Sequence, residues 1–463
     1  MLDPNDWEAF RGDAHRALDA AFDALERVRD RPVWQAVPED VLARFEEPMP
    51  AAGRPLARVI AEYQNTIAPY PTGNQHPRFF GWVHGSATPG AALADALAGL
   101  LDANLGGRDH AAVYVERQVV RWFAELFGQP AGAGGLCTLG TSSANLLAVI
   151  AARGREGARD GMVGYASSAA HGSVRKAFEA AGLGANALRA IPAGADHRID
   201  LDALQAAIAR DRAEGLQPFV LIGCAGTVGI GATDPLDALA TIAARERLWF
   251  HVDGAFGALT ALAPSLRETL GGIERADSIV FDFHKWLRVP YDAGCLIARD
   301  PNRLSDAFAA GDAYLARAER GPAAGAPWFA DLGIDLSRGF RALKVWFALK
   351  EHGADALGAS IERNVALARR LRDLIDADPM LERLAPVPLN IVCFRYKAPG
   401  LDAAALDAFT DELATSIAES GRAVVSTLPL PQGRALRVCI ANHRTEDVDL
   451  DELLAAVHAC ANA

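Results

Sequence analysis

The sequence has no paired cysteines, no cluster of basic residues and no long apolar run, and each absence excludes a class of protein. Its six cysteines are scattered, without a Cys-x-x-Cys pair, which predicts reduced thiols, a cytoplasmic location and no zinc site. The formal net charge is −12, so we do not expect a nucleic-acid partner, which would need a basic face. Apolar stretches such as residues 91–101 are interrupted by Asp95 and fall short of the roughly 18 uncharged apolar residues that a membrane-spanning helix needs. The first residues also lack the basic and apolar regions of a secretory signal.

Prolines crowd the segment between residues 32 and 77. Because helix cannot continue through prolines at such spacing, residues 1–84 are predicted to be an N-terminal arm of short helices joined by extended segments. An arm of this kind is suited to wrapping around a partner subunit.

Residues 110–300 change to alternating strands and helices, within a large domain expected over residues 85–350. Near-continuous apolar strands that alternate with helices predict an α/β fold, with a mostly parallel central sheet covered by helices on both faces. Helix starts are predicted at Asp200 and at Thr233-Asp234-Pro235. Residues 351–463 are predicted to form a smaller C-terminal α+β domain. The expected strands are 162–166, 187–191, 218–224, 248–252, 278–283, 294–298, 390–396, 423–426 and 435–441.

Lys285 ends an apolar strand in the segment Phe281-Asp282-Phe283-His284-Lys285-Trp286. A lone lysine at a strand end is most often a solvated residue. It can also form a Schiff base, since hydrophobic surroundings help to make the amine nucleophilic.

Asp253 follows the apolar strand Leu248–Val252 and precedes Gly254 and Ala255. A carboxylate in such a place needs a charged or hydrogen-bonded partner. In one reading the carboxylate caps a helix or forms a structural ion pair. In the other it binds the ring nitrogen of a pyridine cofactor. A carboxylate beside that nitrogen raises its pKa, so that the ring stays cationic and can accept electrons. The small Ala255 would leave room for a flat ring.

His171 lies where a strand-to-loop segment enters a helix. Alone it is more often structural than catalytic, but beside a flat cofactor it would stack on the ring and reach the substrate. His171, His251, His284 and Asp253 could also be metal ligands. No helical His-x-x-x-His or Cys/His cluster supports a metal site, and none is predicted.

A glycine-rich stretch, residues 134–143, runs directly into an apolar helix that contains Asn145. Backbone N–H groups and hydroxyls at a helix amino terminus bind phosphate. The stretch lacks both the Gly-x-Gly-x-x-Gly and the Gly-Lys-Ser/Thr patterns of nucleotide sites. It is therefore either a cofactor-phosphate site or an ordinary capped loop.

Taken together, these segments resemble the aromatic-L-amino-acid decarboxylase family, the group II decarboxylases that use pyridoxal 5′-phosphate (PLP). The resemblance covers roughly residues 25–455. It rests on the order of His171, Asp253-x-Ala255 and His284-Lys285, and also takes in the segments 76–82, 225–227 and 336–346.

The resemblance implies the aspartate-aminotransferase-like fold (fold type I) and a homodimer with its active sites at the subunit interface. It implies that Lys285 forms the Schiff base with PLP, that Asp253 binds the pyridine nitrogen and that His171 stacks on the ring. For the rest of the site it implies cofactor contacts by Ser142, Ser143, Thr227, Ala255 and His284, and substrate contacts by Trp82, Gly85 and His171.

Three positions depart from the family pattern. Val228 stands where a second threonine is common, and Asp282 stands where animal members carry asparagine. Because an anionic side chain beside a phosphate is unfavourable, we expect only the backbone of Asp282 to contribute. Residues 315–337 contain no tyrosine, whereas family decarboxylases use a loop tyrosine to protonate the quinonoid carbon. A gap-free alignment puts Phe329 at that position, and a phenyl ring cannot donate a proton.

The sequence thus predicts PLP-dependent decarboxylation of a small-molecule substrate, an L-amino acid that is expected to be aromatic, through a Lys285 Schiff base and a quinonoid intermediate. Two alternatives stay open. The missing tyrosine favours oxidative decarboxylation–deamination to an aldehyde, as in related aldehyde synthases. The other alternative is a PLP-binding protein without turnover.

Overall fold

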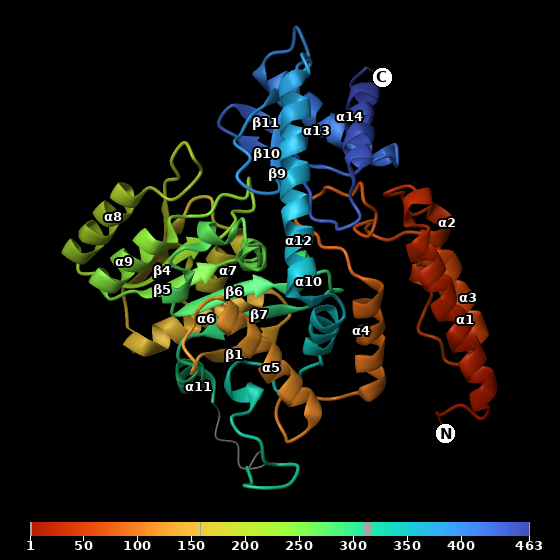
Figure 1. Ribbon diagram of the computed structural model, residues 1–463, viewed down its shortest axis with the longest axis horizontal. Helices are drawn as coiled ribbons and strands as arrows, with labels where there is room; N and C mark the ends of the chain where they lie inside the picture. Colours follow the sequence, from red (N-terminus) through yellow and green to blue (C-terminus); the bar gives the residue numbers. More distant parts are fainter. Residues whose placement is uncertain (1, 158, 310–316, 463) are drawn as a thin grey trace. The chain divides into compact units, whose positions relative to one another are not determined.

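The computed structural model describes residues 2–157, 159–309 and 317–462 (Figure 1). The chain divides into two compact units. The large unit comprises residues 85–372 and 385–392, and the small unit comprises residues 1–84, 373–384 and 393–463. The three-part division expected from the sequence stays a prediction.

The large unit is built on a seven-stranded sheet in the order β1-β7-β6-β5-β4-β2-β3. Strands β2 to β6 run parallel to one another, whereas β7 is antiparallel to both β6 and β1. The predicted α/β fold with a mostly parallel sheet is therefore confirmed. The strands are β1 (Gly134–Thr138), β2 (Met162–Ser167), β3 (Leu188–Ile191), β4 (Gln217–Cys224), β5 (Trp249–Asp253), β6 (Ser278–Asp282) and β7 (Gly294–Ala298).

Strands β2 to β7 each lie within about a residue of their predicted bounds, but β1 was missed. Its first two residues are glycines, which the sequence analysis assigned to a loop. The structure shows why Gly135 lies in a strand: a Cβ atom there would lie 1.9 Å from the carbonyl oxygen of Leu296. The glycine lets β1 approach β7 closely enough to pair with it.

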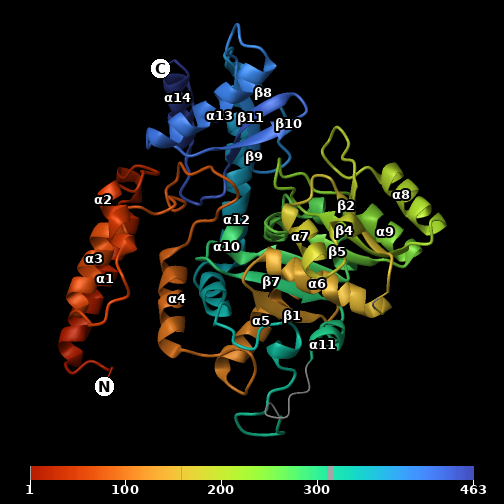
Figure 2. The same cartoon turned by 180° about the vertical axis from the view of Figure 1, so that it is seen from behind.

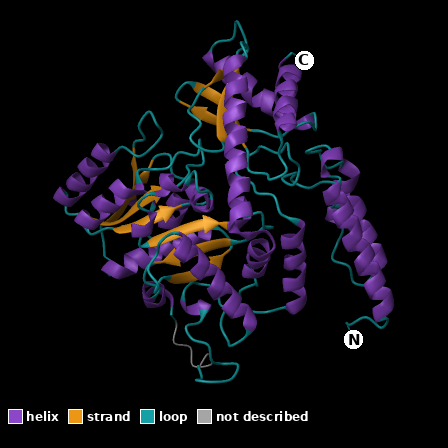
Figure 3. Ribbon diagram, viewed as in Figure 1, coloured by secondary structure: helices purple, strands orange, loops and turns teal. Residues whose placement is uncertain are grey.

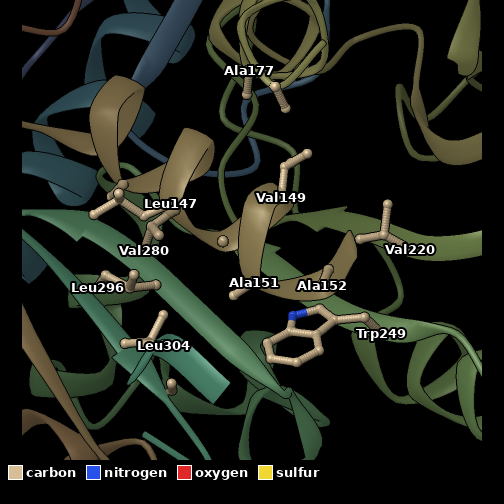
Figure 4. Packing of buried hydrophobic residues seen from close by; sticks show 14 of the residues in the cluster. Leu147, Val149, Ala151, Ala152, Ala177, Val220, Trp249, Val280, Leu296 and Leu304 are labelled. Carbon is tan, nitrogen blue, oxygen red and sulfur yellow. The ribbon is translucent and has the colours of Figure 1, made fainter. Parts of the chain in front are cut away.

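Helices cover both faces of this sheet (Figures 1 and 2). On one face, α6 packs its apolar residues against β4 to β7. Figure 4 shows Leu147 and Ala152 of this helix beside Trp249 and Val280 of the strands. On the other face, Phe123 of α5 contacts Phe281 of β6, with 5.3 Å between ring centroids. The helices of the large unit are α4 (Pro89–Leu101), α5 (Ala111–Leu126), α6 (Thr141–Glu156), α7 (Gly172–Ala180), α8 (Leu201–Ala213), α9 (Leu236–Glu246), α10 (Phe283–Trp286), α11 (Asn302–Phe308) and most of α12 (Ala342–Ala377).

The predicted helix starts have different outcomes. Asp200 caps α8, since its carboxylate accepts the N–H groups of Asp202 and Ala203. In contrast, α9 has Pro235 as its N-cap without a side-chain cap. The predicted capping residue Asp234 instead accepts the N–H groups of Ile199 and Cys224, so it ties a loop to β4.

Short 3-10 helices complete the connections. They are η1 (Val28–Asp30), η2 (Ala43–Glu46), η3 (Ala185–Ala187), η4 (Gly257–Leu262), η5 (Arg267–Leu270), η6 (Ile273–Arg275) and η8 (Phe329–Asp331). In the part of the chain that the structure describes, no helix is long and apolar enough to cross a membrane.

The small unit combines the N-terminal helices with an α+β region (Figure 3). Its sheet has the order β10-β11-β9-β8. The predicted strand 423–426 is wrong, because β10 begins only at Ser426 and Val424 instead forms an isolated bridge with Phe79. The elements are α1 (Trp7–Glu26), α2 (Glu39–Leu42), α3 (Leu56–Thr66), β8 (Leu381–Arg383), β9 (Ile391–Tyr396), α13 (Ala403–Glu419), β10 (Ser426–Leu430), β11 (Gly433–Cys439) and α14 (Asp447–Ala461).

Candidate active site

Asp253 and Lys285 lie at the same edge of the large sheet. Asp253 is the last residue of β5, and Lys285 lies in α10, the single turn of helix that follows the neighbouring parallel strand β6. Asp253 is buried, and the side chain of Lys285 is 20% exposed. Ligands of parallel sheets gather at the carboxyl ends of the strands, so this edge is a suitable place for a reactive amine.

The carboxylate of Asp253 is held by two neutral donors. Its Oδ2 atom accepts a hydrogen bond of 3.0 Å from Nδ2 of Asn145, and its Oδ1 atom accepts one of 3.2 Å from the N–H of Ala255. Burial raises the pKa of Asp253, while the Asn145 hydrogen bond and the charge of Lys285 oppose that rise. A buried carboxylate with only neutral hydrogen bonds is suited to receive a cation.

The Nζ atom of Lys285 lies 2.8 Å from Oδ2 of Asp282. The same carboxylate accepts the backbone N–H of Thr141 at 2.7 Å and the Thr141 hydroxyl at 3.0 Å. The expectation that only the backbone of Asp282 contributes beside a phosphate stays a prediction. Its side chain links the lysine to the amino terminus of α6.

His171 is the N-cap residue of α7. Its Nδ1 atom lies 2.8 Å from the Ser173 hydroxyl and accepts the Ser173 N–H at 3.2 Å. Burial lowers the pKa of His171, and the charges of Asp253 and Lys285 act on it in opposite directions. His171, Asp253 and Lys285 thus share one electrostatic environment.

The amino terminus of α6 carries the residues predicted to bind phosphate. Ser142 is exposed in the first turn, and the Ser143 hydroxyl donates to the Gly140 carbonyl over 2.9 Å. His284 lies next to this turn, since a Cβ atom on Gly140 would be 3.5 Å from its Cε1 atom. The Nδ1 atom of His284 accepts the N–H of Ala293, and burial lowers the pKa of its ring. The turn therefore offers backbone donors and one exposed hydroxyl beside an uncharged imidazole.

Comparison with known proteins identifies the family. Residues 38–397 match the pyridoxal-dependent decarboxylase conserved domain. The chain belongs to this family. An aromatic-L-amino-acid decarboxylase of Bacillus atrophaeus is 31% identical over 98% of this chain and 96% of its own length. A phenylacetaldehyde synthase of Petunia hybrida is 30% identical over 91% of this chain and 87% of its own length. The crystal structure of Oryza sativa TDC with PLP and tryptamine superposes with a TM-score of 0.91 at 26% identity, covering 100% of this chain and 99% of that one.

The protein is accordingly a PLP-dependent amino-acid decarboxylase, a carboxy-lyase of fold type I. The residues at the sheet edge have the chemistry to hold that cofactor: an amine for its aldehyde, a buried carboxylate for its ring nitrogen and a helix amino terminus for its phosphate. When bound, PLP withdraws electrons from the α-carbon of the substrate and so permits loss of carbon dioxide.

Gly85 packs directly on the backbone of Lys285, the residue proposed to bind the cofactor. A Cβ atom at Gly85 would lie 2.1 Å from the carbonyl oxygen of His284 and 2.2 Å from that of Lys285. Only glycine fits, so Gly85 supports the position of Lys285. Trp82, the other predicted substrate residue, belongs to the small unit and is 55% exposed. Its contact with substrate stays a prediction.

Thr227 and Phe329 are both buried, at 3% exposure each. The Thr227 hydroxyl oxygen accepts the N–H of Ala232 over 3.1 Å, within its own turn. Phe329 begins η8 and packs in the apolar cluster on the α6 side of the sheet, with the Arg338 guanidinium 4.7 Å from its ring centroid. Phe329 is therefore a core residue within the chain, although the alignment puts it at a loop position.

Two residues that hold the site were missed in the sequence. Asn145 was noted only as part of the helix, and His251 only as a potential metal ligand. Their spacing carries a signal: His251 lies two residues before Asp253 on the same face of β5, and Asn145 lies three residues after Ser142 on the same face of α6. Both nitrogens of the His251 ring are engaged, by Ser278 and Asn145. Within the described residues no group of three or more His, Cys, Asp or Glu side chains is arranged to hold a metal.

Proposed function

We propose that the protein removes carbon dioxide from an aromatic L-amino acid, with Lys285 as the residue that binds PLP covalently. The observation that carries this proposal is the common location of Lys285 and Asp253, which follow the neighbouring parallel strands β6 and β5. The substrate class is supported by the Bacillus relative named as an aromatic-L-amino-acid decarboxylase and by the tryptamine in the rice TDC structure.

In this proposal Asp253 keeps the ring nitrogen protonated, and His171 stacks on the ring and contacts the substrate. Ser142 and Ser143 bind the phosphate together with the backbone of α6, while His284, Thr227 and Ala255 line the cofactor. Gly85 and Trp82 face the substrate. The charges that act on His171 from Asp253 and Lys285 support this grouping.

We further propose a homodimer with the active site at the subunit interface, in the cytoplasm. Helix α1 has no buried residue within the single chain, and Trp7, Phe10 and Leu18 on it are exposed. A second copy of the chain would cover this surface. Sedimentation of the purified protein as a monomer at micromolar concentration would contradict the dimer.

The test is to incubate the PLP-loaded protein with tyrosine, tryptophan, phenylalanine, dopa, glutamate and aspartate, and to measure carbon dioxide and amine. We expect release from the aromatic substrates. Lys285→Ala should abolish both turnover and the visible absorbance of the cofactor, whereas Lys176→Ala, an exposed lysine on α7, should change neither. No carbon dioxide from any substrate would overturn the proposal.

A second candidate activity is supported by the absence of a tyrosine from residues 315–337 of the sequence and by the Petunia relative named phenylacetaldehyde synthase. In that reaction the amino acid, one dioxygen and one water give an aldehyde, carbon dioxide, ammonia and hydrogen peroxide. Oxygen uptake and peroxide, measured in the same incubations, separate the two activities. Amine formed in equal amount to carbon dioxide, without oxygen uptake, excludes the oxidative reaction.

A further inference from the structure

A line of buried polar side chains runs between α6 and the sheet, behind the candidate site. Asn145 of α6, His251 of β5 and Ser278 of β6 are each 1% exposed. They lie among apolar residues, where an unpaired polar group is costly and a fully bonded network fixes its members in place. The direction of each hydrogen bond in this line can be derived.

The first end of the line is Trp249, whose indole N–H can only donate. Its Nε1 atom lies 2.7 Å from Oγ of Ser278, so that oxygen accepts. The Ser278 proton is then available to Nδ1 of His251, 2.7 Å away. With Nδ1 accepting, the ring proton is on Nε2, which donates to Oδ1 of Asn145 over 2.8 Å.

The second end is the Asp253 carboxylate, which can only accept. It must therefore face the Nδ2 group of Asn145, at 3.0 Å, and this turns the amide oxygen of Asn145 toward His251. The Asp253 end fixes the direction, and the donor at the Trp249 end agrees with it. Burial lowers the pKa of His251 to about 3, so the ring carries the single proton that this arrangement requires.

A branch leads to His171. The second N–H of Asn145 donates to the Ser173 hydroxyl oxygen over 3.2 Å. That hydroxyl then donates to Nδ1 of His171 at 2.8 Å, and the Ser173 N–H points to the same atom at 3.2 Å. Because Nδ1 accepts, a neutral His171 carries its proton on Nε2.

We propose that Trp249, Ser278, His251 and Asn145 form a positioning relay that fixes the Asp253 carboxylate and, together with the Ser173 N–H, the tautomer of His171. The relay occupies Oδ2 of Asp253 and leaves Oδ1, which among the described residues receives only the Ala255 N–H, for the ring nitrogen of the cofactor. It also leaves His171 with an Nε2–H donor for the substrate side. The part that concerns the cofactor rests on the proposed function.

The central variants are His251→Phe, which keeps a ring but has no N–H, and His251→Gln, whose amide nitrogen can still donate to Asn145. In His251→Phe, Asn145 loses one of the two bonds that orient its amide. We expect the dissociation constant for PLP to rise roughly 5- to 100-fold, the range that corresponds to one buried hydrogen bond. His251→Gln should stay within about threefold of the unchanged protein.

A cofactor analogue with CH in place of the ring nitrogen distinguishes positioning from general damage. It cannot use the Asp253 contact, so its affinity should be the same for the unchanged protein and for both variants. A parallel loss of affinity for PLP and for the analogue would overturn the relay, because it would mean that the variant merely distorts the site. Equal PLP affinity in all three proteins would overturn it as well.

The tautomers are tested without cofactor, on the full-length chain labelled with ¹⁵N-histidine. Nitrogen chemical shifts should show His171 and His251 both with the proton on Nε2. His251→Phe should shift the tautomer ratio of His171 partway, because only the Ser173 N–H then still requires Nδ1 to accept. An Nδ1 proton on either histidine in the unchanged protein would refute the relay. Where His251→Phe does not fold, Ser278→Ala removes only the hydroxyl that donates to His251 and should produce the same changes to a smaller extent, since the Nε2–H of His251 still donates to Asn145. If the unchanged protein binds no PLP, the proposed function fails, while the nitrogen shifts still decide the relay.

Discussion

The amine of Lys285 lies 2.8 Å from the carboxylate of Asp282. That carboxylate also accepts two hydrogen bonds from Thr141, at the start of α6. The Asp282 carboxylate thus occupies the donors of Thr141 at the helix terminus that is proposed to bind phosphate. It also places a negative charge beside that phosphate site. This relationship has a consequence for cofactor affinity.

Asp282→Asn is expected to bind PLP more tightly, because it removes a like charge near the phosphate and returns a donor to the site. A change of about 1.4 kcal/mol would lower the dissociation constant about tenfold. Absorbance titration of the cofactor-free protein measures it. Pyridoxal, which lacks the phosphate, is the matched control and should not gain affinity. Weaker binding of both compounds would show that the Asp282–Lys285 contact, rather than the charge, dominates.

Asp253→Asn should lower kcat by about a hundredfold or more, since an uncharged amide cannot keep the ring nitrogen protonated while electrons move into the ring. Asp277→Asn is the matched control. Asp277 is also a carboxylate beside β5 whose pKa is raised by burial, but it accepts the Phe250 N–H next to the amino end of β6. Steady-state kinetics at saturating PLP compare the two variants. Equal loss in both would indicate a structural effect.

The sequence predicted the parallel sheet, and it placed Asp253 and Lys285 at the ends of strands. Both predictions were possible because each strand there is a short apolar run that ends at a polar residue. The pattern failed where pairing depends on backbone approach rather than side chains, as at Gly135 in β1. It also failed for Val424, whose carbonyl accepts the N–H of Phe80. Such long-range partners leave no periodic signal in the chain.

The supporting residues of the site were predicted less well than the site itself. Asp282 was judged by its charge alone, whereas its two neighbours, Thr141 and Lys285, decide its role. Asn145 and His251 come from distant segments, and each satisfies the other in the interior. A single sequence does not reveal that the two segments meet.

Acid should destabilise the small unit through His76. Burial, followed by the charge of Arg78, lowers the pKa of His76 to about 4, while an unfolded histidine titrates near about 6.5. The neutral form is therefore favoured in the folded state, and its contribution is present above about pH 6.5 and is lost as the pH falls toward 4. One such group contributes a slope of at most about 1.4 kcal/mol per pH unit.

His76→Asn removes this titration and keeps an acceptor for the Arg78 N–H, which now bonds Nδ1 of His76 at 3.1 Å. Urea unfolding at pH 7.5, 5.5 and 4.5 should show a shallower loss of stability in the variant than in the unchanged protein. Parallel curves would contradict the assignment.

The ion pair between Arg338 and Glu116 is expected to stabilise the large unit only while both partners are present. The pair is buried, with 2.6 Å between Nη2 and Oε1, and Glu116 also accepts the Cys137 N–H at 2.8 Å. Arg338→Met leaves a buried carboxylate without its cation, which costs about 3–5 kcal/mol. Glu116→Leu leaves the guanidinium unpaired and should cost a similar amount. The double variant removes both charges, so it should lose clearly less stability than the sum of the single variants.

Unfolding by urea, followed by tryptophan fluorescence, gives the change in the free energy of unfolding for each of the three variants. Additive losses would mean that the two side chains act independently, in spite of their contact.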